Sequence, residues 1–463
     1  VANALEESGY MVELLDLSGV LNYVEAVRDH AVSTKAINFG ITATSPQLPA
    51  AVLISKVLRS VREDARVILG GPHVTLVNAA LKKGKQRAVA DYNDITRHFD
   101  VLVAGDGERA IFSAMDDTSP KLIDADDTKS DLFMSEKAFA GASLPARHLI
   151  DIDSYHYSID GERALSLIAQ LGCPFSCRFC GGRSSKSFRL VRMRPTENVV
   201  DEMEHLYKMY GVKGFMFYDD ELNVNLGMVD LMQQITKRQK LLGVSWKLRG
   251  FVKSELFTDQ QAEVMFEAGF RWILVGFESG SPRILANMDK KSTREENTRA
   301  MEIARRHGLK VKALMSIGHP GESAETLRET RDWLIDVKPD DFDISIITTY
   351  PGTSYYDDAV FVGDEWVYTC PKSGDRLYQE NFSYVEESNY YKGRPGSYRA
   401  YVRSESLSQG ELVSARDELE HTLRLKLGIP FPKDSAALSY EHSMGQGAGI
   451  PNNILRISTQ PLL

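Results

Sequence analysis

Residues 161 to about 360 contain six short apolar runs separated by five amphipathic segments. This alternation restricts the fold of the chain more than any other feature, because repeated strand and helix patterns predict parallel strands joined by crossover helices. The expected strands are residues 164–169, 214–218, 244–248, 272–277, 310–317 and 343–348. Glycine or polar residues follow these runs. The segment therefore predicts a (β/α)6 partial TIM barrel with its functional residues at the carboxyl ends of the strands.

A similar alternation occupies residues 1–112 and predicts an α/β domain with a doubly wound (Rossmann-like) parallel sheet. The expected helices are residues 1–8, 20–30 and 48–63, and the expected strands are residues 10–17, 37–44, 67–69 and 101–104. Open α/β sheets bind ligands beyond the carboxyl ends of their strands. The residues at three of these ends are mostly small or glycine: Thr42, Thr44, Ser45, Gly70, Gly71, His73, Gly105, Gly107 and Glu108.

These strand ends have two interpretations. A single glycine turn is typical of a tight connection between a strand and a helix. Three such turns at one sheet edge favour a cofactor cradle, although the absence of a complete GxGxxG motif gives no support to a dinucleotide site. His73 is either a loop-packing histidine or a metal ligand.

The pattern weakens in the rest of the chain. Residues 113–160 are rich in Asp, Ser, Lys and Pro and predict a solvated linker. Residues 361–463 predict a small mixed or helical C-terminal region, with a helix at 407–427 and a loop at 445–453. The aromatic residues of 378–401 either line the open side of the barrel near a substrate or pack a terminal domain.

Three of the four cysteines lie within eight residues, directly after the first barrel strand. Cys173, Cys177 and Cys180 have the spacing Cys-x3-Cys-x2-Cys. Three thiolates on such a short loop can bind one iron-sulfur cluster, because iron prefers soft sulfur ligands. One iron would then have no protein ligand, which is the arrangement that a catalytic cluster needs.

A structural zinc site is the first alternative, and unrelated buried cysteines are the second. Structural zinc normally has four protein ligands, and Cys370, the remaining thiol, has no neighbouring cysteine or histidine in the sequence. A disulfide within the short loop would be strained.

The loops that follow the later barrel strands carry charged residues and glycines. Glu278 or Asp220 could accept hydrogen bonds from an ammonium group, and Arg249 could pair with a carboxylate. Each of these residues could equally form a salt bridge at the barrel mouth. Three glycines could let a nucleoside approach the backbone: Gly280, Gly318 and Gly321.

The composition sets further limits. A length of 463 residues predicts two or three domains. With 43% hydrophobic and 26% charged residues and a net charge of −9, the sequence shows no basic footprint for nucleic acid and no membrane span. Four cysteines fit a reducing, cytoplasmic compartment. Because Val1 opens directly on a helical pattern, we expect further residues upstream.

The CxxxCxxC spacing, with Phe179 directly before the last cysteine, resembles the hallmark of the radical S-adenosylmethionine (SAM) enzymes. The segments GFESGSPRIL, MSIGHPGES and TTYPGTSYY resemble the parts of that barrel that contact SAM. The resemblance implies a 4Fe-4S cluster on the three cysteines and a SAM molecule bound to its open iron. It also implies SAM contacts from Phe179, Gly181, Gly182, Asp220, Arg249, Glu278, Ser279, Gly318 and Tyr350.

Residues 1–112 resemble the cobalamin-binding domain that precedes many radical SAM domains, with the segments ITATSPQLPAA, LGGPHVT and VAGDGE at its ligand edge. The nine strand-end residues from Thr42 to Glu108 would then contact cobalamin. In members of this family that have a histidine on cobalt, it lies in the loop after the first strand, which we expect upstream of Val1.

Taken together, the two resemblances imply reductive cleavage of SAM to a 5′-deoxyadenosyl radical and methylation of an unactivated centre through methylcobalamin. A radical SAM enzyme that does not methylate, such as a cyclase, oxidase or rearrangement enzyme, is one alternative. A metal- or cluster-binding module without catalysis is the other. The expected partners are a small-molecule or peptide substrate and an electron donor such as a flavodoxin or ferredoxin.

Overall fold

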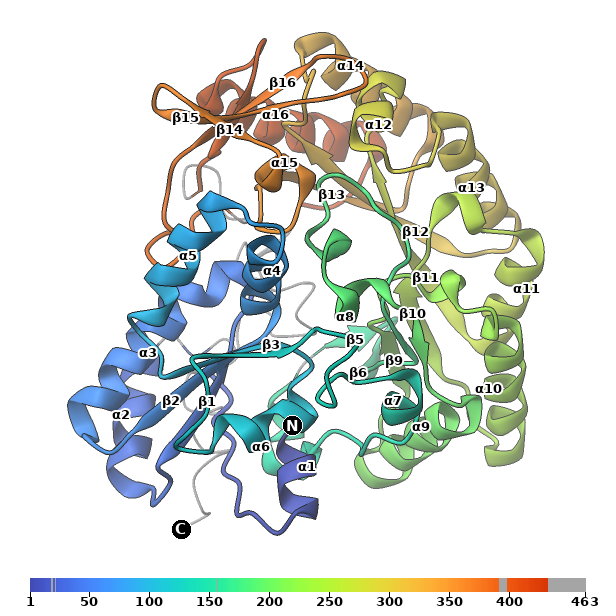
Figure 1. The fold of residues 1–463 in the computed structure, drawn as a ribbon. Helices are drawn as coiled ribbons and strands as arrows, with labels where there is room; N and C mark the ends of the chain where they lie inside the picture. The colour runs from blue at the N-terminus through green and yellow to red at the C-terminus, as the bar shows by residue number, and fades with distance from the viewer. Residues whose placement is uncertain (18–19, 21, 156, 391–397, 432–463) are drawn as a thin grey trace.

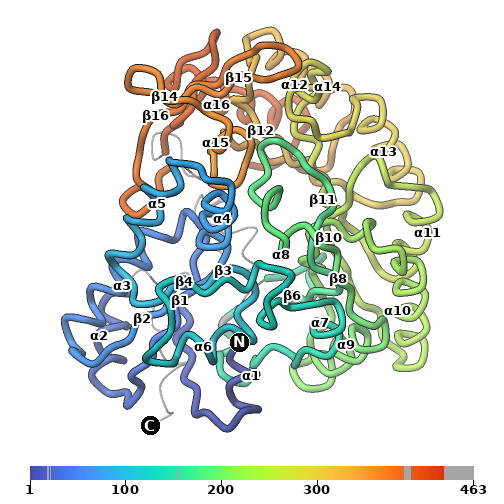
Figure 2. Tube along the Cα trace, viewed as in Figure 1, coloured from blue at the N-terminus to red at the C-terminus, as the bar shows by residue number. Residues whose placement is uncertain are grey.

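The computed structural model describes residues 1–463 except 18–19, 21, 156, 391–397 and 432–463. An N-terminal α/β domain lies beside a larger half-open barrel, and a C-terminal unit lies over one end of both (Figures 1 and 2). The predicted α/β fold class, with a Rossmann-like domain followed by a partial TIM barrel, is confirmed.

The N-terminal sheet has four parallel strands in the order β1-β2-β3-β4. Its strands are β1 (Asn38–Thr42), β2 (Arg66–Gly70), β3 (Val101–Gly105) and β4 (Leu122–Ala125). All four carboxyl ends therefore lie at one edge of the sheet. Among the described strands the order follows the chain without reversal.

Helices cover both faces of this sheet, because its strands are apolar on both sides. Alternate residues belong to two separate cores, with Val67 and Leu69 in one and Ile68 in the other. This arrangement is typical of parallel sheets covered on both faces. The helices are α1 (Ala2–Glu7), α2 (Tyr23–Ser33), α3 (Leu48–Val61), α4 (Pro72–Leu81), α5 (Gln86–Thr96) and α6 (Gly107–Ala114).

The barrel sheet has six parallel strands and one short antiparallel edge strand, in the order β13-β12-β11-β10-β9-β6-β5. The strands are β5 (Ser158–Ile159), β6 (Glu162–Leu167), β9 (Gly214–Phe217), β10 (Lys247–Phe251), β11 (Phe270–Glu278), β12 (Lys310–Ile317) and β13 (Asp341–Ile346). The outer helices are α9 (Thr196–Tyr210), α10 (Met228–Leu242), α11 (Asp259–Ala268), α13 (Arg294–Arg306) and α14 (Ala324–Val337). These helices form the right-hand wall in Figure 1.

The C-terminal unit contains a four-stranded antiparallel sheet that the sequence patterns did not predict. It is built from β14 (Val360–Val362), β15 (Glu365–Thr369), β16 (Arg376–Glu380) and β17 (Val402–Ser404) and is followed by α16 (Gln409–Leu427). The predicted helix at 407–427 is therefore confirmed, whereas the predicted loop at 445–453 lies outside the described residues. None of the described helices is long and apolar enough to cross a bilayer.

Three expectations about local structure were wrong. Residues 11–17 form no strand. Instead, the side chains of Leu15 and Leu17 pack on the N-terminal core. The segment expected to be only a linker contributes β4, which pairs with β3. Strand β10 begins and ends three residues later than expected, because Arg249 and Gly250 continue the pairing with β9.

Candidate functional site

The three clustered cysteines lie on the loop of residues 172–183, which we call the cluster loop. Backbone hydrogen bonds hold its beginning: Gly172 N–H donates to Asp220 Oδ2 over 2.7 Å, and Cys173 N–H donates to the Phe188 carbonyl over 2.9 Å. In the middle of the loop, Arg178 N–H donates to the carbonyl of Met288 over 2.8 Å. The loop is therefore fixed by contacts from both sides of the barrel mouth.

All three thiols are free and influence one another electrostatically. Burial raises the pKa of Cys173 to about 11, and the charge of Cys177 adds to this shift. Part of the surface of Cys180 is accessible, but protein surrounds the thiol, and this burial raises its pKa to about 12. Burial also raises the pKa of Cys177, while Lys290 and Lys253 act in the opposite direction.

The donor set fits a cluster better than a single ion. Among the described residues, no group of three His, Cys, Asp or Glu side chains is placed to hold one metal ion. Three coupled thiols on one loop are suited to a cluster, which spreads its ligands over several irons. The fourth cysteine, Cys370, is 0% exposed and donates to Asn287 Oδ1 over 3.5 Å, so it is engaged elsewhere in the fold.

Two buried lysines provide positive charge beside Cys177. Lys253 and Lys290 are 3% and 5% exposed. Burial acts to lower the pKa of Lys290, but the charges of Glu278 and Cys177 raise it overall. Such cations would offset the negative charge of bound thiolates.

Glu278, predicted to accept hydrogen bonds from an ammonium group, already has partners for both carboxylate oxygens. Lys290 Nζ lies 3.2 Å from Oε1, and the Ser316 hydroxyl donates to Oε2 over 2.7 Å. Its backbone has a φ of 64°, which is uncommon for a residue with a side chain. Glu278 therefore organises the site, and its role in binding SAM stays a prediction.

Glu221 was not predicted as a site residue, although it follows the predicted Asp220 directly. Its Oε2 is buried and has no hydrogen-bond partner in the described structure. Burial raises its pKa to about 7, against the opposing charges of Lys290 and Lys253. A buried carboxylate without a donor is costly unless a ligand supplies one, so Glu221 is a better candidate for an ammonium contact than Glu278. The signal in the sequence was the run of three acids after β9.

Asp220 and its neighbour Asp219 support the beginning of the cluster loop. Asp219 is 1% exposed and accepts from the Ala169 N–H over 3.2 Å, while burial raises its pKa to about 7. Asp220 accepts from Gly172, and burial raises its pKa as well. Both carboxylates therefore hold the backbone that leads into the cluster loop.

Four other predicted SAM contacts have protein neighbours. Arg249 lies within β10 and donates to the Tyr157 hydroxyl over 3.1 Å. The Ser279 hydroxyl lies 3.0 Å from Thr330 Oγ1 on α14. The remaining two contact aromatic rings: Phe179 packs edge-on against His319, and Tyr350 packs against Tyr384 and Tyr390.

The glycines expected to admit adenosine have close protein neighbours, and their contact with adenosine stays a prediction. A Cβ at Gly280 would lie 2.8 Å from Trp333 Cβ, and one at Gly321 would lie 2.5 Å from Asp375 Oδ2. At Gly318, with a φ of 91°, the nearest atoms belong to Val402, Ile346 and Leu412 at 3.4–3.5 Å.

Gly181 and Gly182 are also closely packed. A Cβ at Gly181 would lie 3.1 Å from the Leu76 methyl groups, and one at Gly182 would lie 3.0 Å from Phe188 Cβ. Leu76 belongs to α4, so Gly181 allows the N-terminal domain to approach the cluster loop.

In the N-terminal domain, Ser45 and His73 meet at the carboxyl edge of the sheet. The Ser45 hydroxyl lies 2.8 Å from His73 Nδ1, and the imidazole is 0% exposed. Burial lowers the pKa of His73 to about 3, and its Nε2 has no partner among the described residues. The Tyr384 ring lies 5.3 Å away, centroid to centroid. A neutral, enclosed imidazole fits loop packing, and a role as cobalt ligand stays a prediction.

The other predicted cobalamin contacts differ in the space around them. Gly70 would accept a Cβ, since the nearest atoms, of Val103, would lie at a van der Waals distance of 3.9 Å. A Cβ at Gly71 would lie 2.7 Å from Thr42 Oγ1, and one at Gly105 would lie 2.5 Å from the Ala125 backbone. Three residues have neighbours within the fold: Thr44 forms a capping box with Gln47, and Gly107 and Glu108 lie against Val1.

The edge of the N-terminal domain and the cluster loop meet at one point. A Cβ at Gly352, in the loop after β13, would lie 3.4 Å from the carbonyl oxygens of both Gly181 and Leu76. Close by, Lys83 pairs with Asp357 over 3.1 Å. The thiols and the predicted cobalamin edge therefore belong to one continuous region between the domains.

Comparisons with known proteins agree with this architecture. Residues 167–334 match the model of the Radical SAM superfamily. An uncharacterized methyltransferase of Pyrococcus horikoshii is 29% identical, over 69% of this chain and 69% of its own length. An anaerobic magnesium-protoporphyrin IX monomethyl ester cyclase of Rubrivivax gelatinosus is 24% identical over 76% of this chain and 63% of its own length.

Two solved structures share the fold. The radical SAM methyltransferase TsrM from Kitasatospora setae, with cobalamin and a [4Fe-4S] cluster bound, has a TM-score of 0.60 and 18% identity, covering 99% of this chain and 94% of TsrM. The cobalamin-dependent SAM radical enzyme OxsB has a TM-score of 0.51 and 16% identity, covering 72% of this chain and 48% of OxsB. The match to the Radical SAM superfamily therefore covers most of the barrel, and the chain as a whole shares the two-domain fold of TsrM and OxsB.

Proposed function

We propose that this protein is a cobalamin-dependent radical SAM methyltransferase. The observation that carries the proposal is the set of three free, mutually coupled thiols on a loop fixed at the barrel mouth, next to the N-terminal domain. A cluster on these thiols would supply the electron that cleaves SAM to a 5′-deoxyadenosyl radical, and cobalamin would supply the methyl group.

The residues of the chain would act mainly by position and charge. Cys173, Cys177 and Cys180 would hold the cluster. Lys253 and Lys290 would offset thiolate charge in a buried setting where water cannot do so. Glu221 would accept a hydrogen bond from the ammonium group of SAM through its unpartnered Oε2.

The N-terminal edge would hold cobalamin. Gly70 ends β2 with no side chain, and Ser45 and His73 form a polar pair at the same edge of the sheet. The aromatic residues Tyr350, Tyr384 and Tyr390 pack against the same domain and would exclude water from this region. We propose that the other six residues predicted at this edge also contact cobalamin: Thr42, Thr44, Gly71, Gly105, Gly107 and Glu108.

The relatives favour methylation over the alternatives, since the Pyrococcus protein and TsrM are both named methyltransferases. The Rubrivivax cyclase keeps cyclisation as the second candidate. We further propose an electron donor such as a flavodoxin or ferredoxin, a small-molecule or peptide substrate, and a cytoplasmic location.

Anaerobic reconstitution with iron, sulfide, SAM and a reductant tests the proposal. We expect release of 5′-deoxyadenosine from the native protein, complete loss in Cys177→Ala, and retention in the control Cys370→Ser, whose thiol is engaged away from the cluster loop. Absence of 5′-deoxyadenosine from reconstituted native protein would refute catalysis. Product mass then separates the candidates, because a methyltransferase adds one methylene equivalent and a cyclase does not.

A further inference from the structure

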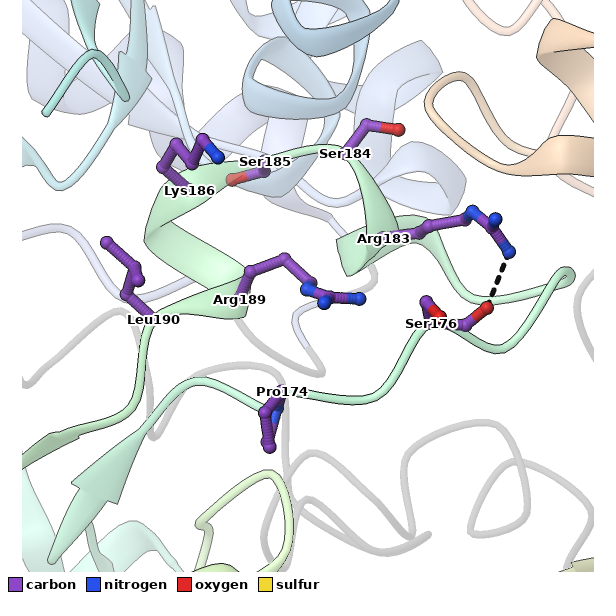
Figure 3. Close-up of a pocket in the computed structure, with 8 residues that line it drawn as sticks. All are labelled: Pro174, Ser176, Arg183, Ser184, Ser185, Lys186, Arg189 and Leu190. Atoms are coloured by element: carbon purple, nitrogen blue, oxygen red, sulfur yellow. Dashed lines mark hydrogen bonds between the residues drawn. The ribbon is translucent and has the colours of Figure 1, made fainter. Parts of the chain in front are cut away.

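A cavity of about 440 Å³ lies directly against the cluster loop. Its lining comes from the loop itself and from the segment that follows it, including α8 (Lys186–Arg189). The lining residues are Pro174, Ser176, Arg183, Ser184, Ser185, Lys186, Arg189 and Leu190 (Figure 3). The volume is within the range of roughly 300–1,000 Å³ found for small-molecule sites.

This cavity is unusually cationic. Ligand pockets are mostly lined by apolar and aromatic side chains, whereas three of these eight residues are Arg183, Lys186 and Arg189. No ion pair joins any of the three to a carboxylate among the described residues. The concentration of positive charge contrasts with a net charge of −9 for the whole chain.

The two arginines are held in place by the loop that they line. Arg183 donates one N–H to the Ser176 carbonyl over 2.5 Å, and Arg189 donates one N–H to the Phe175 carbonyl over 2.7 Å. Figure 3 shows both side chains extending across the cavity toward the loop. Each guanidinium has five donors, so most donors of both groups remain for a ligand.

One acid behind the cavity wall already accepts two hydrogen bonds from the segment that follows the cluster loop. Asp126 is 1% exposed, lies behind Ser185, and accepts from the Ser185 hydroxyl and the Ser187 N–H, both over 2.7 Å. The Ser184 hydroxyl donates to the Gly352 carbonyl over 2.8 Å. Because these hydroxyls are engaged, the cations decide what the cavity binds.

We propose that this cavity binds the phosphate group of a small-molecule substrate. Three like charges around one cavity repel one another, and a dianion relieves that repulsion better than a monoanion. The planar guanidinium fork also matches the oxygens of phosphate. The identification of the ligand as a substrate rests on the proposed function, whereas the binding of phosphate does not.

Calorimetric titration of inorganic phosphate into the reconstituted full chain at low ionic strength tests the proposal. Lys186→Glu reverses one cavity charge, and the Lys186 side chain forms no hydrogen bond or ion pair among the described residues. Lys240→Glu, on the exposed surface of α10, is the matched control. We expect saturable binding that is weakened about tenfold or more by Lys186→Glu and changed less than about twofold by Lys240→Glu.

Equal affinities for the two variants, or no saturable binding to native protein, would overturn the proposal. Competition by SAM would also overturn it, because the cavity would then bind the SAM carboxylate. Citrate binding more tightly than phosphate would assign the cavity to carboxylates and reject phosphate. An acidic donor protein that displaces phosphate would make the cavity part of a protein interface and so contradict the proposal.

Failure of the proposed function can be distinguished from failure of the phosphate proposal. If native protein binds phosphate but releases no 5′-deoxyadenosine, the anion site stands and the radical chemistry does not. If it releases 5′-deoxyadenosine but binds no phosphate, only the substrate class is wrong.

Discussion

The guanidinium of Arg87 lies 4.0 Å from the centroid of the Tyr356 ring. Arg87 belongs to α5 of the N-terminal domain, and Tyr356 to α15 (Ser354–Asp357) beyond the last barrel strand. Arg87 is 7% exposed and also donates to Gln379 Oε1 of β16 over 2.7 Å. One buried cation therefore connects the N-terminal domain to two other segments.

Removing this cation should loosen the contact between the domains. We expect Arg87→Ala to lower the free energy of unfolding by about 2 kcal/mol, because a desolvated cation–π contact and a charged hydrogen bond are lost together. Urea unfolding followed by tryptophan fluorescence measures the change. Arg97→Ala is the control, since Arg97 forms an exposed pair with Asp94 and should cost less than about 0.5 kcal/mol. Similar losses in both variants would contradict this prediction.

The same contact should be sensitive to pH through Asp91, which accepts a hydrogen bond from the Tyr356 hydroxyl. Burial raises the pKa of Asp91 from 3.8 to about 6, against the hydrogen bond from Tyr356 and the charge of Arg87. A raised carboxyl pKa favours the folded state most below pH 3.8, and this contribution is lost progressively as the pH rises from about 3.8 to about 6.

Asp91→Asn removes the titration but keeps an acceptor for Tyr356. We expect the variant to be more stable than the native protein already at pH 5, and this difference to grow by about 1.4 kcal/mol by pH 8, which corresponds to about one pKa unit. Urea unfolding of both proteins from pH 5 to pH 8 measures the difference. A difference that does not grow with pH would show that Asp91 is not the titrating group.

Gly105 should be intolerant of any side chain. Its φ is 90°, and an added Cβ would lie 2.5 Å from the Ala125 backbone, so Gly105→Ala should combine strain with collision. We expect a loss of at least about 3 kcal/mol in urea unfolding. Gly84→Ala isolates the strain, because Gly84 has a φ of 69° with nothing within 4 Å of an added Cβ. That control should lose only about 1 kcal/mol, and equal losses would rule out the collision.

Glu221 should matter for SAM and not for the cluster. We expect Glu221→Gln to retain native iron and sulfide content but to bind SAM about tenfold or more weakly, because a charged hydrogen bond to the ammonium group is lost. Equilibrium binding of SAM to anaerobically reconstituted protein measures the effect. Glu197→Gln, on the exposed start of α9, should bind SAM as the native protein does. Unchanged affinity in Glu221→Gln would remove this residue from the site.

Several parts of the site depended on contacts that no local pattern reveals. The run of acids after β9 was visible in the sequence, but only the fold shows that Asp220 holds Gly172 while Glu221 has an unpartnered oxygen. Likewise, Gly321 and Gly105 stood out in the sequence, but only the fold shows that Asp375 and Ala125 lie beside them. These neighbours come from segments distant in the sequence.

The sequence by itself determined the two α/β domains, most barrel strands and the three clustered cysteines. Hydrophobic periodicity and close spacing are local properties, and they survive in any structure that buries the apolar faces. The tertiary structure alone decided the pairing of β4, the end of β10 and the C-terminal sheet. It also decided that residues 11–17 form no strand, because a strand forms only where another strand offers its edge. The tertiary structure also decided that three cations surround one cavity, since this depends on how the cluster loop lies against α8.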